Sequence, residues 1–236
     1  MKNVKWLVAS VALAVAGVAN AGDLSMTVTA TSDYDFRGVT QTAQDPALQL
    51  SVDWAAENGL YVGAWGSNVD FGDCCDENVE LDLYAGFAGG DEEGLTYDVG
   101  GVYYMYPGAD DLDYPEIYAG VAYGMFDAKL WYSWYFFALD EDAYYIEGNM
   151  NVPLPAEFGL ALHVGYSDGT VFDDFEGYES YFDYSVGITR SFGGFDFELK
   201  WVDGSDWKAA DGTQGDVLSS EARVILSVST TLPWAE

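Results

Sequence analysis

The sequence predicts an all-β chain that closes into a transmembrane, antiparallel, up-and-down β-barrel of about 12 strands. Each candidate strand alternates an apolar row with a polar row, the connections alternate in length, and the chain carries 18 Tyr, 13 Phe and 8 Trp. Membrane barrels gather such aromatic residues at both membrane interfaces. A soluble sandwich or closed barrel would alternate similarly, but its interior would have to hold this aromatic load. The membrane barrel is therefore favoured.

The N-terminal residues have the features of a cleaved signal peptide. Lys2 and Lys5 precede an apolar run from Trp6 to Val18, and small residues follow at 19–21. The run is too short to cross a bilayer as a helix, which needs about 20 residues. We expect residues 1–21 to be removed on export and residues 22–236 to form one domain in the outer membrane of a Gram-negative bacterium.

Twelve candidate strands follow, separated by Gly, Asp, Asn and Pro. They cover residues 24–36, 46–55, 60–70, 79–87, 95–106, 116–123, 126–136, 144–152, 158–167, the two arms of 181–203, and 221–232. Connections after the even-numbered strands are short, whereas those after the odd-numbered strands are mostly longer and acidic. Short periplasmic turns that alternate with long outer loops are typical of outer-membrane barrels.

The segment 181–203 has the pattern of one complete β-hairpin. Gly193-Gly194 suits a two-residue turn that needs positive φ at both positions, and this turn places Phe192 opposite Phe195. One face of the hairpin is then apolar, with Arg190 as its one long charged side chain, and the other face is small, polar and charged. We expect the apolar face to meet lipid and the polar face to line the lumen.

One strand, 60–70, is left with two registers. A tight turn at Asn58-Gly59 would point Tyr61 and Trp65 outward. A bulge would instead point Leu60 and Val62 outward.

The net charge of the chain limits the kinds of molecule that it can bind. The chain carries 40 acidic and 8 basic residues, a formal net charge of -32, which excludes nucleic acid and favours cations. If the apolar rows face lipid, the inward rows carry the candidate pore-lining residues Asp53, Glu80, Asp82, Asp98, Glu116, Asp127, Lys129, Glu147, Asp196, Glu198, Lys200 and Arg223. A lumen with this excess of carboxylates should pass cations and small neutral solutes.

Two functions remain open. The first is a passive channel for small solutes with cation preference. The second is a plugged structural or surface-interaction barrel, because inward Tyr and Trp rings and cross-strand ion pairs can fill a lumen of this size. Its acidic outer segments, 110–113 and 140–142, would then bind cations or bridge to lipopolysaccharide. Outer-membrane lipid and lipopolysaccharide are expected partners in either case.

The sequence does not indicate an enzyme. No Gly-x-Ser-x-Gly, His-Glu-x-x-His or phosphate-binding loop is present, and we expect no cofactor and no metal site. His163 is the only histidine, and its strand phase points it inward as a hydrogen-bonded packing group. Cys74 and Cys75 are adjacent, which favours a strained vicinal disulfide or two free thiols over a metal site.

Several ordered segments carry a family resemblance. They are residues 32–42 (SDYDFRGVTQT), 45–49, 63–71, 104–108, 116–120, 186–195 and 223–229. Together they resemble the TorF-family porins of proteobacteria over nearly all of the chain after residue 21. The resemblance implies an outer-membrane barrel and brings no catalytic residues. The chain departs from the family at its end, where residues 233–236 continue past the last apolar strand residue.

Overall fold

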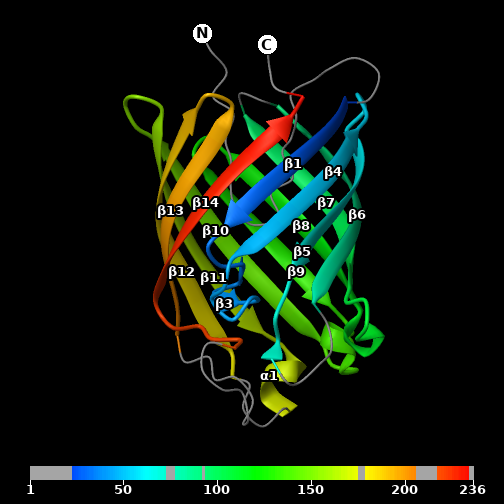
Figure 1. Ribbon diagram of the computed structural model, residues 1–236. Helices are drawn as coiled ribbons and strands as arrows, with labels where there is room; N and C mark the ends of the chain where they lie inside the picture. Colours follow the sequence, from blue (N-terminus) through cyan, green and yellow to red (C-terminus); the bar gives the residue numbers. More distant parts are fainter. Residues whose placement is uncertain (1–22, 73–77, 92–93, 175–178, 206–216, 234–236) are drawn as a thin grey trace.

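The computed structural model describes residues 23–72, 78–91, 94–174, 179–205 and 217–233. It is a closed antiparallel barrel in which twelve strands follow one another around the ring, and the last strand pairs with the first (Figure 1). The strands are β1 Asp23–Thr31, β4 Ala47–Ala55, β5 Leu60–Asn68, β6 Val79–Gly90, β7 Leu95–Met105, β8 Tyr114–Tyr123, β9 Phe126–Ser133, β10 Ala143–Pro153, β11 Phe158–Asp168, β12 Tyr181–Phe192, β13 Phe195–Gly204 and β14 Arg223–Leu232. The predicted fold class is confirmed.

The two ends of the barrel differ as the connection lengths predict. One end, at the top of Figure 1, carries the short turns, and we call it the turn end. The other, the loop end, carries the long connections, with short helical turns η2 (Asp110–Leu112), η3 (Phe136–Ala138) and α1 (Thr170–Asp174). Two predicted strands were too long: 24–36 ends at Thr31 and 126–136 ends at Ser133. In both cases the chain turns into a connection although aromatic residues continue the apolar pattern.

The hairpin at 193–194 has the predicted register. Phe192 pairs with Phe195 and Arg190 with Phe197, and both glycines have positive φ, 62° and 82°. The Arg190 guanidinium lies on the outer face, 4.8 Å from the centroid of the Phe158 ring. The open register of β5 is settled in favour of the bulge, since Leu60 and Val62 are exposed and Tyr61 is buried.

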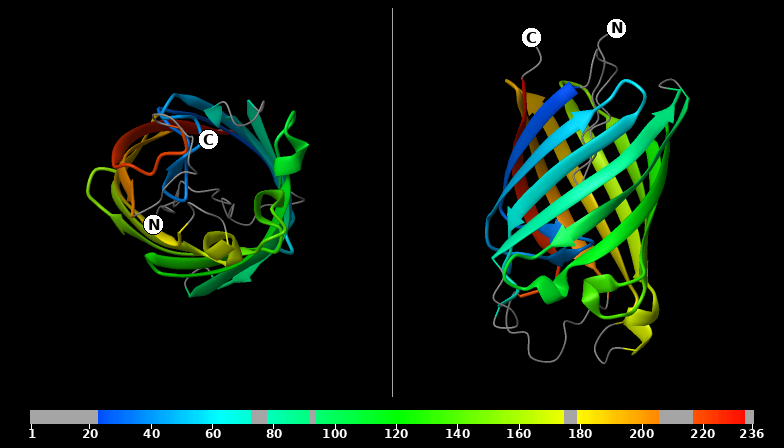
Figure 2. Two further views of the ribbon diagram at one scale, coloured as in Figure 1. Left: turned by 90° about the horizontal axis from the view of Figure 1, so that it is seen from below. Right: turned by 90° about the vertical axis from the view of Figure 1, so that its right-hand side faces the viewer.

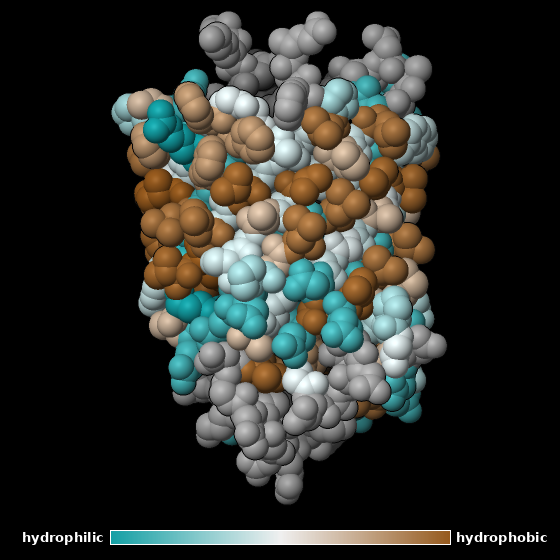
Figure 3. Space-filling view, viewed as in Figure 1, coloured by the Kyte–Doolittle hydropathy of each residue, from teal (hydrophilic) through white to brown (hydrophobic). Residues whose placement is uncertain are grey.

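The outer surface is apolar around the barrel. Figure 3 shows a broad brown band on one face, displaced toward the turn end, with hydrophilic residues toward the loop end. The band consists of outward Leu, Val, Ile, Phe, Tyr and Trp side chains; Leu199, for example, is 54% exposed. A patch of this extent would be unstable in water and is suited to hydrocarbon. The described residues include no helix long and apolar enough to cross a membrane.

Most buried residues of the strands lie inside the ring, and the two halves of the inner wall differ. Large rings cover the inner wall from β5 to β10; they are Tyr61, Tyr84, Tyr104, Tyr118, Trp131 and Tyr145, all buried. On β12, β14, β1 and β4 the inner row carries many small hydroxylated residues; it includes Ser185, Thr189, Ser227, Ser229, Thr29 and Ser51, all half-buried. Between them, the inner row of β13 carries the charged residues Asp196, Glu198 and Lys200. Free space in the lumen should therefore lie along the hydroxyl-bearing wall.

Some predictions fall outside the described residues. These are the signal peptide at 1–21, the cysteines Cys74 and Cys75, and the chain end at 234–236.

Candidate functional site

The first connection folds into the barrel. This segment, residues 32–46, is called loop 1 here, and it contains the two short strands β2 (Asp35–Phe36) and β3 (Val39–Thr40). Seen along the barrel axis, the dark blue segment lies inside the ring of strands (Figure 2, left). Arg37 and Gly38 form the turn between β2 and β3 with φ of 52° and 81°. The turn therefore lies inside the lumen and presents the Arg37 side chain to the wall.

Arg37 is bound on the aromatic side of the lumen. Its Nη1 and Nη2 donate to the two carboxylate oxygens of Glu116 on β8, at 3.0 and 2.7 Å. Tyr104 donates to the same carboxylate at 2.9 Å, and the guanidinium lies 4.5 Å from the centroid of the Tyr145 ring. Burial disfavours a charged guanidinium, but the Glu116 carboxylate holds the pKa of Arg37 above its ordinary value.

Asp33 and Asp35 of loop 1 are bound on the opposite side of the lumen. Arg223 on β14 donates to Asp33 at 2.5 Å and to Asp35 at 2.7 Å, and Lys200 on β13 donates to Asp35 at 2.9 Å. Burial alone would raise the pKa of Asp35, yet Lys200 and Arg223 hold it below its ordinary value. Loop 1 is thus tied across the lumen between β8 and the β13–β14 pair.

Short contacts brace loop 1 itself. Thr40 and Thr42 donate to the Asp33 carboxylate at 2.5 and 3.1 Å. Gly38 fits tightly against the wall, since an added Cβ would lie 2.5 Å from Cβ of Asp183 on β12. A glycine is therefore required at this position by both its φ and its surroundings.

A carboxylate cluster on β6 lies next to loop 1. Tyr34 donates to Glu80 at 3.0 Å, and its ring packs against Trp65 at 5.3 Å between centroids. Burial and the neighbouring Glu80 raise the pKa of Tyr34 well above its ordinary value, so its hydroxyl acts only as a neutral donor. Asp82, two residues along β6, is 1% exposed, and neither carboxylate oxygen has a hydrogen-bond partner.

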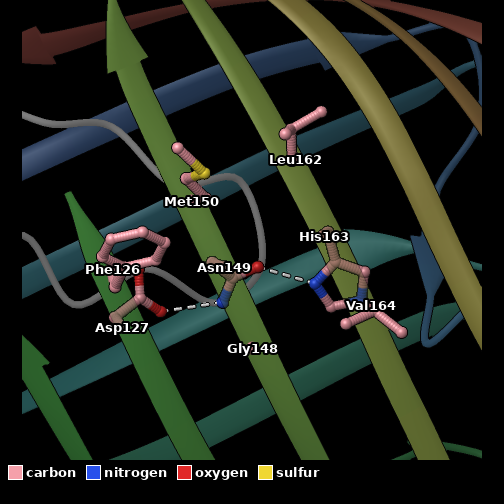
Figure 4. Close-up of a pocket in the computed structure, with 8 residues that line it drawn as sticks. All are labelled: Phe126, Asp127, Gly148, Asn149, Met150, Leu162, His163 and Val164. Atoms are coloured by element: carbon pink, nitrogen blue, oxygen red, sulfur yellow. Dashed lines mark hydrogen bonds between the residues drawn. The ribbon is translucent and has the colours of Figure 1, made fainter.

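A second polar network crosses β9, β10, β11 and β12. Figure 4 shows the Asn149 side chain between Asp127 and His163, with hydrogen bonds of 2.8 and 2.7 Å. The other ring nitrogen of His163 lies 2.7 Å from Asp183 and 3.0 Å from the Tyr145 hydroxyl. His163 is therefore inward and hydrogen-bonded, as its strand phase predicts.

A depression of about 290 Å³ lies in the wall beside this network. It is lined by apolar Phe126, Met150, Leu162 and Val164 as well as by the polar residues of Figure 4. Gly148 contributes no side chain there, so the depression follows from a missing Cβ between neighbouring strands.

Every candidate pore-lining residue lies on an inner row, but the set divides by exposure. Glu80, Asp82, Glu116, Glu147 and Arg223 are buried, whereas the remaining residues are half-buried; these are Asp53, Asp98, Asp127, Lys129, Asp196, Glu198 and Lys200. The half-buried group includes Lys129, which is paired with Asp98 at 3.0 Å, and Asp53, which accepts hydrogen bonds from Tyr84 and Ser51. The half-buried carboxylates are the better candidates for contact with a solute.

The acidic outer segments have structural contacts where they are described. Asp113 accepts a hydrogen bond from the Tyr106 amide at 2.7 Å, and Asp142 accepts one from the Thr170 hydroxyl. Among the described residues, no group of three or more His, Cys, Asp or Glu side chains is arranged to hold a metal ion.

Loop 1 is the part of the site that sequence reasoning missed. The sequence predicts a first strand over residues 24–36, whereas β1 ends at Thr31 and residues 32–36 belong to loop 1. The signal was Arg37: it is one of few basic residues, and it follows two acidic residues at the end of a strand. Asp183 on β12 was missed because nothing in its own strand marks it as a partner of His163.

A closed antiparallel barrel with an apolar outer face and a charged interior is the outer-membrane type of β-barrel. Within that class, the chain belongs to the family described as bacterial protein of unknown function (Gcw_chp), whose model matches residues 15–232. No curated protein matches the chain by sequence.

Two solved structures are similar in fold. The first is a KdgM porin, with a TM-score of 0.56 and 9% identity, covering 87% of this chain and 98% of that chain. The second is the KdgM porin in complex with disordered oligogalacturonate, with a TM-score of 0.55 and 9% identity, covering 89% and 98%. At this identity the similarity concerns the fold.

Proposed function

We propose that this protein is an outer-membrane diffusion channel for small cations and neutral solutes, and that loop 1 constricts its lumen. The observation that carries the proposal is the closed twelve-stranded barrel whose inner rows are charged along most strands. The fold shared with KdgM porins and the resemblance to TorF-family porins support it. The proposal assigns no catalytic role, and it treats His163 as part of the hydrogen-bonded network with Asn149, Asp183 and Tyr145.

Cation preference follows from the charges of the inner wall. The candidate pore-lining set contains nine carboxylates and three basic side chains. Lys129, Lys200 and Arg223 are each paired with a carboxylate, so no basic side chain of the set is free to attract an anion. An acidic oligosaccharide of the kind bound in the KdgM complex should be repelled from this lumen.

Planar-bilayer recording tests the proposal. Folded protein should give discrete conductance steps, with a reversal potential that shows cation preference in a salt gradient. A triple variant, Asp53→Asn, Asp127→Asn and Glu198→Gln, should reduce that preference because these three carboxylates are half-buried on the inner wall.

A matched control removes the same charge from the surface. Asp140, Glu157 and Glu221 are exposed and lie in connections or beside a strand end. Their neutralisation to Asn and Gln should leave the reversal potential unchanged. Equal effects of both triple variants would show that the inner row does not line the ion path.

The plugged structural barrel is the second candidate, favoured by the buried rings and by the ion pairs of loop 1. The two candidates differ in what release of loop 1 does. In a gated channel, a variant that releases loop 1 should raise conductance. If both the wild type and that variant fold but neither gives conductance steps, the result favours the plugged structural barrel.

A further inference from the structure

Three carboxylates are buried together beneath loop 1. They are Glu80 and Asp82 on β6 and Glu116 on β8, and each is 1% exposed. Their local arrangement is fixed by the barrel, because alternate residues on β6 point to the same face and Glu116 follows on an inner row two strands away.

The three carboxylates differ in the hydrogen bonds that they accept. Glu116 receives both terminal nitrogens of Arg37, and Glu80 receives the hydroxyls of Tyr34 and Tyr106. Asp82 receives no hydrogen bond at either oxygen. The Tyr114 hydroxyl is also buried and unpartnered.

The charges around Asp82 do not balance. The titratable groups around Asp82 come from several parts of the chain. They are Glu80 and Tyr84 from β6, Tyr104 from β7, Tyr106 from the connection after β7, Glu116 and Tyr114 from β8, and Tyr34 from loop 1, with Arg37 of loop 1 beside Glu116, Tyr104 and Tyr114. In this set Arg37 is the one cation, and Glu116 engages it with both carboxylate oxygens. With every carboxylate ionised, the cluster would carry three negative charges against one positive charge.

An ionised carboxylate in such a place is unstable unless a cation joins it. Buried carboxylates without a partner take up a proton instead of remaining charged. A metal ion would need several ligands at short range, and no described group of three His, Cys, Asp or Glu side chains has that arrangement. The geometry favours a proton.

We infer that the Glu80–Asp82 pair is a proton-binding site, occupied at Asp82 when loop 1 is docked and vacated when loop 1 leaves. Tyr34 of loop 1 is buried, donates to Glu80 and interacts electrostatically with Asp82, so we expect release of the loop to admit water and permit Asp82 to ionise. The docked state then binds one more proton than the released state. By linkage, lower pH favours docking until the acidic residues of loop 1 are themselves protonated.

Infrared spectroscopy of the folded, full-length mature chain in detergent tests the site directly. At pH 7.5 the wild type should show the carbonyl stretch of a protonated carboxyl, and Asp82→Asn and Asp82→Leu should both lack it. Asp127→Asn is the matched control, since Asp127 is inward, half-buried and hydrogen-bonded by Asn149, and it should retain the band. Persistence of the band in both folded Asp82 variants would overturn the assignment.

Coupling to loop 1 requires a second variant. Asp33→Asn with Asp35→Asn removes the carboxylates that bind Arg223 and Lys200, and it should abolish the band at pH 7.5 by releasing the loop. Amide exchange of residues 32–46 reports release independently. Two results would contradict proton coupling. One is an unchanged infrared band in a variant whose loop 1 is released, and the other is amide protection of loop 1 that changes with added Na⁺ or Ca²⁺ at fixed pH.

The consequence for gating rests on the proposed channel function, whereas the infrared result does not. In bilayers, the wild type should close as pH falls from 8 to 5, and Asp82→Asn should stay closed across this range. If the infrared band behaves as expected but no variant conducts, the proton site stands and the channel proposal fails. Steps with the same pH response in wild type and Asp82→Asn would overturn the gating role of the site.

Discussion

The ion pair between Arg37 and Glu116 should control whether loop 1 stays in the lumen. Arg37→Gln removes both charge-assisted bonds and leaves Glu116, 1% exposed, without a cation. Loss of one partner of a buried pair costs about 3–5 kcal/mol. Release of loop 1 rehydrates Glu116, so the docked state alone bears this cost. A shift of about 3 kcal/mol corresponds to a roughly hundredfold change in the docking equilibrium.

Hydrogen exchange measured by mass spectrometry follows this change. Amides of residues 32–46 should exchange roughly a hundredfold faster in Arg37→Gln, while strand amides keep their protection. Bilayer conductance should rise in the same variant. Arg190→Gln is the matched control, since Arg190 lies outside on the Phe158 ring and its removal should alter neither readout.

A double variant separates the ion pair from simple loss of packing. The double variant Arg37→Gln, Glu116→Gln leaves no uncompensated buried charge at this pair, so the amides of loop 1 should recover part of the protection that Arg37→Gln loses. The two substitutions together should then cost less than the sum of their separate costs, as expected for two residues that form an ion pair. Unchanged exchange in the single variant would refute the role assigned to Arg37. Equal exchange in the single and double variants would attribute the effect to packing.

Three other changes should act at separate points. Gly38→Ala should release loop 1, because its Cβ would meet Asp183 at 2.5 Å and its φ is 81°; faster exchange of loop 1 in a folded barrel measures this. Leu199→Arg on the outer row should destabilise the folded barrel in vesicles by about 2–4 kcal/mol if Leu199 lies near the bilayer midplane. Urea titration measures this change, and unchanged stability would place this row outside the hydrocarbon. Docking of loop 1 should also depend on Asp35, whose pKa burial would raise but paired cations hold below its ordinary value. The contribution of Asp35 to docking is complete above the ordinary aspartate pKa of about 4, and it is lost as the pH falls through the lower pKa that Asp35 has in the docked state. In the wild type, amide exchange of loop 1 should therefore rise in acid, and Asp35→Asn should lack this rise.

Local turn chemistry explains why the register could be predicted. Gly193-Gly194 accepts positive φ at both turn positions, and that choice fixes each pair along β12 and β13. Alternation then decides which face of each strand is apolar. At β5 the same argument left two answers, because Asn58-Gly59 suits both a tight two-residue turn and a turn with a glycine bulge; in the structure Gly59 has a φ of 92°.

Loop 1 could not be predicted in the same way because its partners are distant in sequence. Asp33 and Arg223 are separated by 190 positions, and they meet only after the barrel closes. Alternation is also silent about a segment that leaves the strand while keeping aromatic residues, as Tyr34 and Phe36 do. The unpartnered state of Asp82 likewise depends on what loop 1 places above it.

Selectivity and gating should be separable in this barrel. Loop 1 contributes Asp33, Asp35 and Arg37 to the lumen, a net charge of one negative when all three are ionised. Its release frees Lys200 and Arg223, but the wall set of nine carboxylates and three basic side chains is unchanged. The lumen should therefore stay cation-selective after loop 1 is released, with a somewhat weaker cation preference than the lumen that still holds the net negative charge of loop 1. The reversal potential of Arg37→Gln in a salt gradient measures this, and anion preference in that variant would show that the two freed basic residues dominate the path.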